Sequence, residues 1–189
     1  MIYNGRIQYT KCTECPYEDK NKVFGSGNIN GKYIFMGECP GVDEECDGIP
    51  FIGKAGQALR LVLKEIGILD DAWFTNYVIC RPPNNNFQDV GMNIATKLCL
   101  NGLMVELDYL HDNHFTHLFV LGNNACSAFN LKGISSIKGR VYELRDVQTN
   151  FYLKLIPNFH PSYIIRRGGK GNKLLWEDWK NTFISGINE

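Results

Sequence analysis

One stretch of this sequence limits its fold more than any other: a loop rich in glycine, proline and carboxylates that follows a short apolar segment. Residues Tyr33–Met36 are apolar and aromatic, which predicts a buried strand. From Ala55 to Ile66 the apolar residues return at helical spacing. Between them lie four glycines, two prolines and five carboxylates. Such a backbone bends sharply and lets a ligand approach closely. We therefore expect a site loop at the carboxyl end of a strand, where open α/β sheets bind their ligands.

Strands and helices alternate along the rest of the chain. We expect strands at residues 33–36, 73–80, 117–121, 141–144 and 153–156, and helices at residues 55–69, 93–110, 125–131 and 175–187. This order is typical of a mostly parallel sheet with helices on both faces. No internal repeat or linker divides the sequence, so residues 1–189 are expected to form a single domain.

The composition narrows the class of protein. Lysine plus arginine and aspartate plus glutamate number 20 each, so no bulk positive field indicates nucleic acid, and any basic patch must be local. No apolar run approaches the roughly 18 residues of a membrane-spanning helix, and the first residues do not resemble a signal peptide. We expect a soluble, intracellular (cytoplasmic) monomer with no membrane partner.

Seven cysteines are many for such a chain, and an odd number leaves one unpaired in any disulfide scheme. In a reducing compartment they are better explained as metal ligands, catalytic groups or buried hydrophobes. Cys12 and Cys15 have a metal-type spacing that also suits zinc or a redox dithiol. Cys80 and Cys99 are the partners we expect, and a set without a second Cys-x-x-Cys fits iron–sulfur at least as well as zinc. Cys126 is expected to be a small buried hydrophobe.

Polar residues stand near the ends of several expected strands. Glu38, Asn76 and His160 are the clearest examples, and the ends of parallel strands meet at one crevice. A histidine held by a following proline can donate a hydrogen bond to a developing anion, although a histidine that simply caps a strand is more common. The Asn76 amide offers a donor and an acceptor that suit a nucleic-acid base, or it is a satisfied core asparagine.

Two further features have equally plain alternatives. Phe51 is either a core residue or a platform on which a base stacks. The segment Arg166–Lys173 holds four cations among glycines, which suits phosphate contacts or an ordinary solvated loop.

Taken in order, these residues form the motifs of a known family. The motifs are Gly37-Glu38-Cys39-Pro40-Gly41, Gly48-Ile49-Pro50-Phe51-Ile52-Gly53 followed by Ala55-Gly56, Thr75-Asn76 followed by Cys80-Arg81-Pro82-Pro83, Leu121-Gly122, and His160-Pro161-Ser162. From Cys12 to about Arg167 the sequence resembles the family 4 uracil-DNA glycosylases, the iron–sulfur branch of the uracil-DNA glycosylase superfamily. The resemblance implies a three-layer α/β/α sandwich with a central four-stranded parallel sheet.

The resemblance also implies roles for the pocket residues. Phe51 matches the aromatic residue that stacks on a flipped uracil, and Asn76 matches the amide that reads the pyrimidine edge. His160 matches the histidine that hydrogen-bonds uracil O2. Glu38 matches the glutamate near the attacking water, and Glu44 is a second acid at a matching position.

Metal and DNA contacts follow from the same resemblance. The ligands of a structural [4Fe–4S] cluster are matched by Cys12, Cys15, Cys80 and Cys99. The loop that pushes into the duplex is matched by the segment after His160, which carries Ser162, Tyr163, Arg166 and Arg167.

The sequence departs from the family pattern at Cys39, where the family usually has a small residue. As a candidate substrate-binding residue, Cys39 can crowd the water, alter base preference or merely fill space. The spacing from Cys80 to Cys99 is longer than expected, and the neutral net charge suggests modest DNA affinity.

The function that we expect is monofunctional excision of uracil from DNA by base flipping, as in base excision repair, leaving an abasic site. Three alternatives stay open: a non-catalytic module that binds uracil-containing or modified DNA, a glycosylase for another deaminated or modified base, and a hydrolase of small nucleotides.

Overall fold

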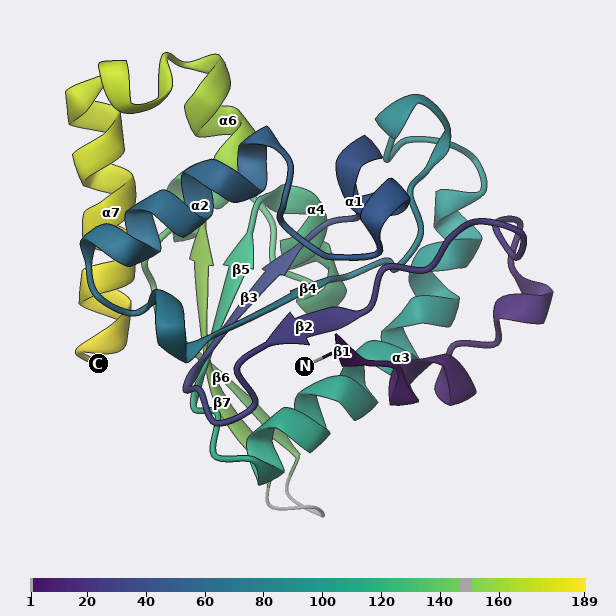
Figure 1. Cartoon of the computed structure of the whole chain (residues 1–189). Helices are drawn as coiled ribbons and strands as arrows, with labels where there is room; N and C mark the ends of the chain where they lie inside the picture. The colour runs from purple at the N-terminus through teal and green to yellow at the C-terminus, as the bar shows by residue number, and fades with distance from the viewer. Residues whose placement is uncertain (1, 147–150) are drawn as a thin grey trace.

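The computed structural model describes residues 2–146 and 151–189, and within them the strands form one mixed, seven-stranded sheet (Figure 1). The strands are β1 Ile2–Tyr3, β2 Gly25–Gly27, β3 Tyr33–Gly37, β4 Ala72–Asn76, β5 His117–Leu121, β6 Tyr142–Asp146 and β7 Phe151–Asn158. The α-helices are α1 Val42–Asp47, α2 Lys54–Glu65, α3 Met92–Asp112, α4 Asn123–Cys126, α5 Ile134–Ile137, α6 Pro161–Arg166 and α7 Lys173–Ile187. The α/β class predicted from the sequence is confirmed.

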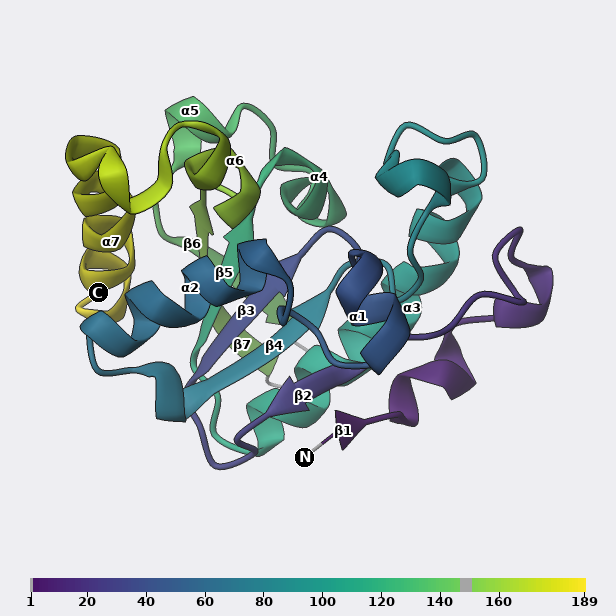
Figure 2. The same ribbon diagram turned by 45° about the horizontal axis from the view of Figure 1, so that its top comes forward.

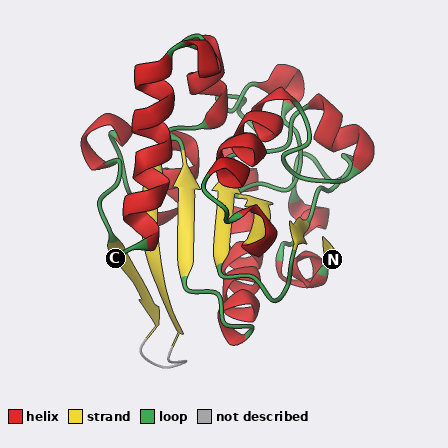
Figure 3. Ribbon diagram, turned by 60° about the vertical axis from the view of Figure 1, so that its left-hand side comes forward, coloured by secondary structure: helices red, strands yellow, loops and turns green. Residues whose placement is uncertain are grey.

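The strand order across the sheet is β1-β2-β4-β3-β5-β7-β6. Strands β4, β3, β5 and β7 pair in parallel at the centre, while β2 with β1 at one edge and β6 at the other pair antiparallel (Figure 3). The sheet is therefore wider and more mixed than the four-stranded parallel sheet that the resemblance implies. Strand β2 is Gly-Ser-Gly, which lacks the apolar alternation by which a strand is recognised in a sequence.

Alternate residues of the central strands face two separate hydrophobic layers. On one face, Ile34 and Met36 of β3 pack in a cluster with Leu103 of α3. On the other face, Phe35 packs in a second cluster with helices α2 and α7, and its ring centroid lies 5.8 Å from that of Phe183. Helices thus cover both faces, as Figure 2 shows. The loops at the carboxyl ends of the parallel strands remain free to build a site.

The second central strand ends earlier than predicted. β4 stops at Asn76, whereas the expected strand continued to Cys80, and Cys80 lies beyond β4 in a single bridge to Lys22. The chain stays close to β3 past this point, because the Tyr77 amide donates to the Gly37 carbonyl at 2.8 Å. The expected strand 73–80 is therefore a five-residue strand followed by an irregular extended segment.

The helix expected before Leu131 is also shorter than predicted, since α4 gives way to a 3-10 turn at Ser127–Phe129. The predicted small hydrophobe Cys126 is fully buried there. None of the helices in the described residues has the length and apolar character that crossing a bilayer requires.

Candidate active site

A cavity of about 280 Å³ opens where β3, β4 and β7 end. Its lining includes eight of the residues singled out from the sequence: Glu38, Cys39, Glu44, Phe51, Asn76, His160, Ser162 and Arg166. These residues come from positions far apart in the sequence. Their convergence is the one that parallel strand ends predict.

Phe51 forms one wall of the cavity in an unusual backbone conformation. Its φ is 57°, in the left-handed region that bulky residues rarely adopt, and its side chain is buried. The Arg60 guanidinium holds this turn, since its Nε donates to the Phe51 carbonyl at 2.9 Å. The same guanidinium lies over the Phe74 ring, 4.1 Å from its centroid, and the Phe51 and Phe74 ring centroids are 5.8 Å apart. The surroundings therefore fix the position of the ring.

Helix α2 approaches this turn so closely that only glycine fits at position 56. A Cβ on Gly56 would lie 2.0 Å from the carbonyl carbon and oxygen of Phe51. We expect Gly56→Ala to lower the free energy of unfolding by about 2 kcal/mol, because overpacking outweighs the gain of about 1 kcal/mol that alanine brings to a helix. Urea unfolding measures the change. Gly171→Ala is the control, because a Cβ there would meet nothing within 4 Å. Equal losses in both variants would contradict the close packing.

Glu44 closes the glycine- and proline-rich loop onto itself. One carboxylate oxygen accepts from the Ile52 and Gly53 amides at 2.9 and 2.8 Å, and the other accepts from the Gly41 amide at 3.1 Å. The side chain is only 8% exposed. Backbone donors therefore occupy both oxygens, and the carboxylate fixes the loop that carries Phe51.

His160 is the N-cap of α6, and its hydrogen bonds define which ring nitrogen carries the proton. Nδ1 accepts from the Ser162 amide at 3.2 Å and lies 2.8 Å from the Ser162 Oγ. Arg166 donates to that Oγ at 3.1 Å, so the hydroxyl hydrogen is free to point to Nδ1. The proton of the neutral ring is then on Nε2. Burial and the positive charge of Arg166 lower the pKa of His160, while Glu38 and Glu44 oppose this shift.

Asn76 is buried at 3% exposure, and its backbone carbonyl accepts from Arg6 at 2.7 Å. Among the described residues its side-chain amide has no hydrogen-bond partner, although it lines the cavity. Gly37 leaves the room that it needs. A Cβ on Gly37 would lie 2.6 Å from Asn76 Oδ1 and 2.7 Å from Phe51 Cζ.

Cys39 lines the same cavity beside two acids. Burial raises the pKa of its thiol, and the charges of Glu38 and Glu44 raise it further against the opposing charge of Arg81. At neutral pH the side chain is therefore a thiol rather than a thiolate.

A second cavity of about 460 Å³ adjoins the first. It shares Glu38, His160, Ser162 and Arg166 with the first and adds Tyr163. The segment after His160 was expected to be a loop, but it forms the short helix α6. Pro161 favours this helix, because proline suits the first helical position. Arg167 lines neither cavity and lies over the Tyr163 ring, 5.4 Å from its centroid.

The basic, glycine-rich segment continues beyond α6, and one of its cations forms an ion pair. Lys170 pairs with Glu65 at 2.6 Å. Gly168 and Gly169 adopt positive φ values, which lets the chain reverse into α7.

The four cysteines of the expected metal site gather at another corner of the fold. Cys80 and Cys99 are buried, and Cys12 and Cys15 pack against the same hydrophobic cluster. The pKa of Cys80 is raised to about 12, first by burial and then by Cys99, Cys12 and Cys15, with Lys22 opposing. The four thiols are thus within electrostatic reach of one another.

The spacing of these thiols bears on the kind of metal. Within residues 2–146 and 151–189, no three cysteine, histidine or acidic side chains lie close enough to hold one metal ion. A cluster needs a wider ligand set, because each cysteine binds a different iron. The four cysteines are a donor set of the kind that holds a [4Fe–4S] cluster. A structural zinc ion also takes four cysteines, and the metal content of the protein distinguishes the two.

Comparison with known proteins gives the family. The model of the uracil DNA glycosylase superfamily matches residues 24–182. The type-4 uracil-DNA glycosylase of Thermotoga maritima is 33% identical over 177 residues, which cover 89% of this chain and 85% of the relative. The chain belongs to the type-4 uracil-DNA glycosylase family. The relative from Archaeoglobus fulgidus is 34% identical over 82% of this chain and 79% of its own length, and that from Pyrobaculum aerophilum is 30% identical over 82% and 80%.

In this type-4 family member two polar residues at the site were not singled out from the sequence. Asn124 donates to Glu38 Oε2 at 2.8 Å and lines the second cavity. Asn85 lines the first cavity in a left-handed conformation, and its Oδ1 accepts from Arg81. The signal for Asn124 was its place directly after Gly122 at a strand end, whereas Asn85 stood in an expected loop with no motif to mark it.

Proposed function

We propose that this protein is a monofunctional uracil-DNA glycosylase, which hydrolyses the N-glycosidic bond of uracil in DNA and leaves an abasic site. One observation carries the proposal: an imidazole N–H, a carboxylate and an amide without a hydrogen-bond partner among the described residues line one base-sized cavity. The named activity of the relatives agrees with it.

Binding requires that the target nucleotide leaves the helix, because its glycosidic carbon is out of reach inside the base stack. The Phe51 ring offers a fixed face on which the extruded uracil stacks. The Asn76 amide presents a donor and an acceptor, which match the O4 and N3–H of uracil. Cytosine has the opposite pattern on this edge and is rejected, since a mismatched buried polar pair is left unsatisfied.

Bond cleavage turns uracil into an anionic leaving group and the sugar into an oxocarbenium-like cation. The His160 Nε2–H donates to uracil O2, where the negative charge builds. A neutral ring suffices for this role, and burial together with Arg166 favours the neutral form. The donor is already oriented before reaction, because Ser162 and Arg166 fix the other side of the ring.

Glu38 faces the sugar cation and the water. Asn124 binds its Oε2, which leaves Oε1 free to hold and orient a water molecule. For Glu44 we propose a positioning role, since its carboxylate is committed to three backbone amides. None of the residues that line the two cavities is a lysine, so no Schiff-base step is proposed.

Contacts to the DNA backbone are assigned to α6 and its C-terminal end. Ser162, Tyr163 and Arg166 line the second cavity beside the catalytic one, and Arg167 follows them. They offer hydroxyl and guanidinium donors of the kind that bind phosphate oxygens.

For the cysteine corner we propose a structural [4Fe–4S] cluster. Cys12, Cys15, Cys80 and Cys99 would hold it, and it would join the N-terminal segment to α3 and to the chain after β4. No step of base release passes through this group, which serves to order the fold.

The direct test uses labelled oligonucleotides with one uracil, single-stranded and opposite guanine or adenine, followed by alkaline cleavage of abasic sites. We expect strand scission at uracil only, over many turnovers. Scission only at another deaminated base would show that the substrate is that base and not uracil. Cys39→Ala would then test whether the thiol determines this base preference. Tight binding without base release by iron-loaded protein would favour a binding module instead.

A further inference from the structure

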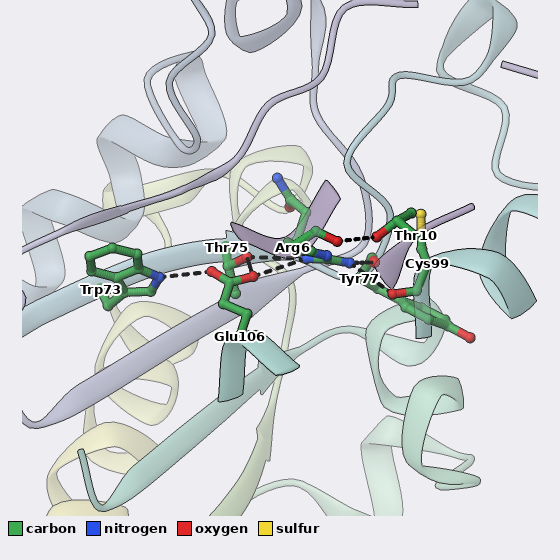
Figure 4. A network of polar contacts seen from close by, with 8 residues as sticks. Arg6, Thr10, Trp73, Thr75, Tyr77, Cys99 and Glu106 are labelled. Carbon is green, nitrogen blue, oxygen red and sulfur yellow. Dashed lines mark hydrogen bonds and ion pairs between the residues drawn. The ribbon is translucent and has the colours of Figure 1, made fainter. Parts of the chain in front are cut away.

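A buried ion pair lies behind Asn76, which lines the cavity. Figure 4 shows the polar contacts of this pair. Arg6 and Glu106 are both 0% exposed, and Arg6 Nη1 lies 3.1 Å from Glu106 Oε2. Arg6 comes from a 3-10 helix at Gly5–Tyr9, and Glu106 comes from the middle of α3. Neither residue belongs to a motif of the sequence, and Arg6 precedes the segment that the superfamily model matches.

Arg6 donates hydrogen bonds to backbone carbonyls at the end of β4. Nη1 donates to the Asn76 carbonyl at 2.7 Å, and Nη2 donates to the Tyr77 carbonyl. Nη2 also reaches the Cys99 carbonyl at 3.4 Å. One guanidinium thus joins the strand end that carries Asn76 to the helix that carries Cys99.

Glu106 is held as firmly as its partner. Its Oε2 accepts from the Thr75 hydroxyl at 2.9 Å, and its Oε1 accepts from the Trp73 indole at 3.0 Å. Both donors lie on β4, so the carboxylate holds from α3 the strand whose end Arg6 binds.

Two glycines open the space that the pair occupies. A Cβ on Gly25 would lie 1.8 Å from Glu106 Oε1, and a Cβ on Gly102 would lie 2.8 Å from Arg6 Cγ. The surrounding backbone is therefore shaped around these two side chains.

Stability alone does not account for the pair. Two charges removed from water pay a desolvation cost that often cancels their attraction, and apolar residues of similar volume commonly stabilise as well or better. Arg6 Nε is moreover buried without a hydrogen-bond partner among the described residues. Unlike apolar residues, the pair supplies hydrogen bonds of fixed direction to the carbonyls of residues 76 and 77.

We propose that Arg6, oriented by Glu106, is a positioning residue for uracil recognition. Its bond to the Asn76 backbone carbonyl fixes the end of β4. The Asn76 side-chain amide, which has no hydrogen-bond partner among the described residues, thereby stays aimed into the cavity. This inference rests on the proposed function, because the effect of Arg6 is transmitted to uracil through Asn76.

The test is a double-mutant cycle on the full-length, iron-loaded protein. Arg6→Met with Glu106→Leu removes both charges together but leaves the Trp73 indole, the Thr75 hydroxyl and the carbonyls of residues 76 and 77 without these partners. We therefore expect a lower melting temperature, and activity is measured well below it. We expect this pair of changes to lower single-turnover kcat/KM on a uracil oligonucleotide by about 100-fold, as small misplacements of substrate-positioning groups do. Added to Asn76→Ala, the same changes are expected to lower it less than about twofold further, because Arg6 acts through Asn76.

Arg145→Met with Glu143→Leu is the matched control, an exposed ion pair on β6 with its atoms 2.8 Å apart. It is expected to leave kcat/KM and melting unchanged. Full additivity of the Arg6 and Asn76 changes, or wild-type activity in the Arg6 variant, would overturn the positioning role. If the double variant does not fold, Arg6→Lys is taken through the same cycle, with the same criterion. A wild-type protein that releases no uracil would overturn the proposed function and this inference with it, whereas an active wild type with additive variants would overturn only the role of Arg6.

Discussion

Replacement of His160 by alanine is expected to lower the single-turnover rate of uracil release by about 100-fold or more. The physical reason is the placement of one donor. The Ser162 amide occupies Nδ1, so the ring presents Nε2–H to the cavity. A donor aimed at a developing anion stabilises the transition state more than the bound substrate, and its removal lowers kcat rather than raising KM. Rapid-quench assays with enzyme in excess measure that rate directly.

The pH dependence gives a second readout of the same ring. Burial and Arg166 lower the pKa of His160, so the neutral ring persists to a pH below the ordinary histidine value of about 6.5. Activity is lost as pH falls through the lowered pKa, because protonated Nδ1 can no longer accept from the Ser162 amide. Arg166→Gln removes a charge that opposes protonation. The acid limb of the rate profile is then expected to move to higher pH.

The control for His160→Ala is His111→Ala, a histidine on α3 that packs on Phe151 with ring centroids 5.4 Å apart and lines neither cavity of the site. Its rate of uracil release is expected to match the wild type. A His160→Ala protein that excises uracil at the wild-type rate would remove the histidine from the mechanism. An acid limb that moves to lower pH in Arg166→Gln would show that Arg166 does not hold the ring neutral.

Much of the site could be predicted from the sequence because its residues occupy places that topology alone defines. Strand β5 was expected at the residues where it lies. Glu38, Asn76 and His160 stand at the ends of strands, and the ends of parallel strands meet whatever the intervening loops do. These three residues could therefore be predicted to line one crevice before any contact was known.

The remaining features depend on contacts that no local pattern encodes. Arg6 carries no motif, and only the folded chain brings it to the carbonyl of residue 76. Asn124 is marked by a strand end, yet its bond to Glu38 joins residues far apart in sequence. The sequence could not decide whether Phe51 is a core residue or a stacking platform, because both roles suit an aromatic side chain. Its left-handed φ depends on Arg60 and on the missing side chain of Gly56. These are tertiary constraints, which sequence periodicity cannot report.

Cys39 shows how the two sources of information combine. The sequence marked it as a departure from the family pattern that can crowd the water, alter base preference or merely fill space. Its position in the cavity beside Glu38, with a raised pKa, makes it an uncharged wall residue. We therefore expect a neutral thiol there to add bulk beside the water that Glu38 is proposed to hold, without competing for its proton.

Loss of the proposed cluster is the second large effect that we expect. Cys99→Ala is expected to remove the iron of anaerobically purified protein, about four atoms per chain in the wild type, together with its visible absorbance. Cys99 projects from α3 beside Cys80, and the other two ligands stand on a short N-terminal segment. Within the described part of the chain, no side chain of residues 12–15 has a hydrogen bond or ion pair to a distant part of the sequence. Such anchors lie before it, at Arg6, and after it, where Tyr17 donates to Asp89. Without the cluster it is therefore expected to be cleaved early by proteases, and the melting temperature is expected to fall.

Cys126→Ala separates loss of a ligand from loss of a buried thiol. Cys126 is fully buried on α4, its Sγ lies 4.0 Å from the Val120 carbonyl, and its pKa is raised by burial and not by the other cysteines. Its replacement leaves a small cavity that costs about 1 kcal/mol, while iron content and N-terminal protection should stay at the wild-type level. Equal iron in the Cys99 and Cys126 variants would exclude Cys99 as a ligand. Zinc in place of iron in the wild type would contradict the cluster, because four cysteines suit either metal site.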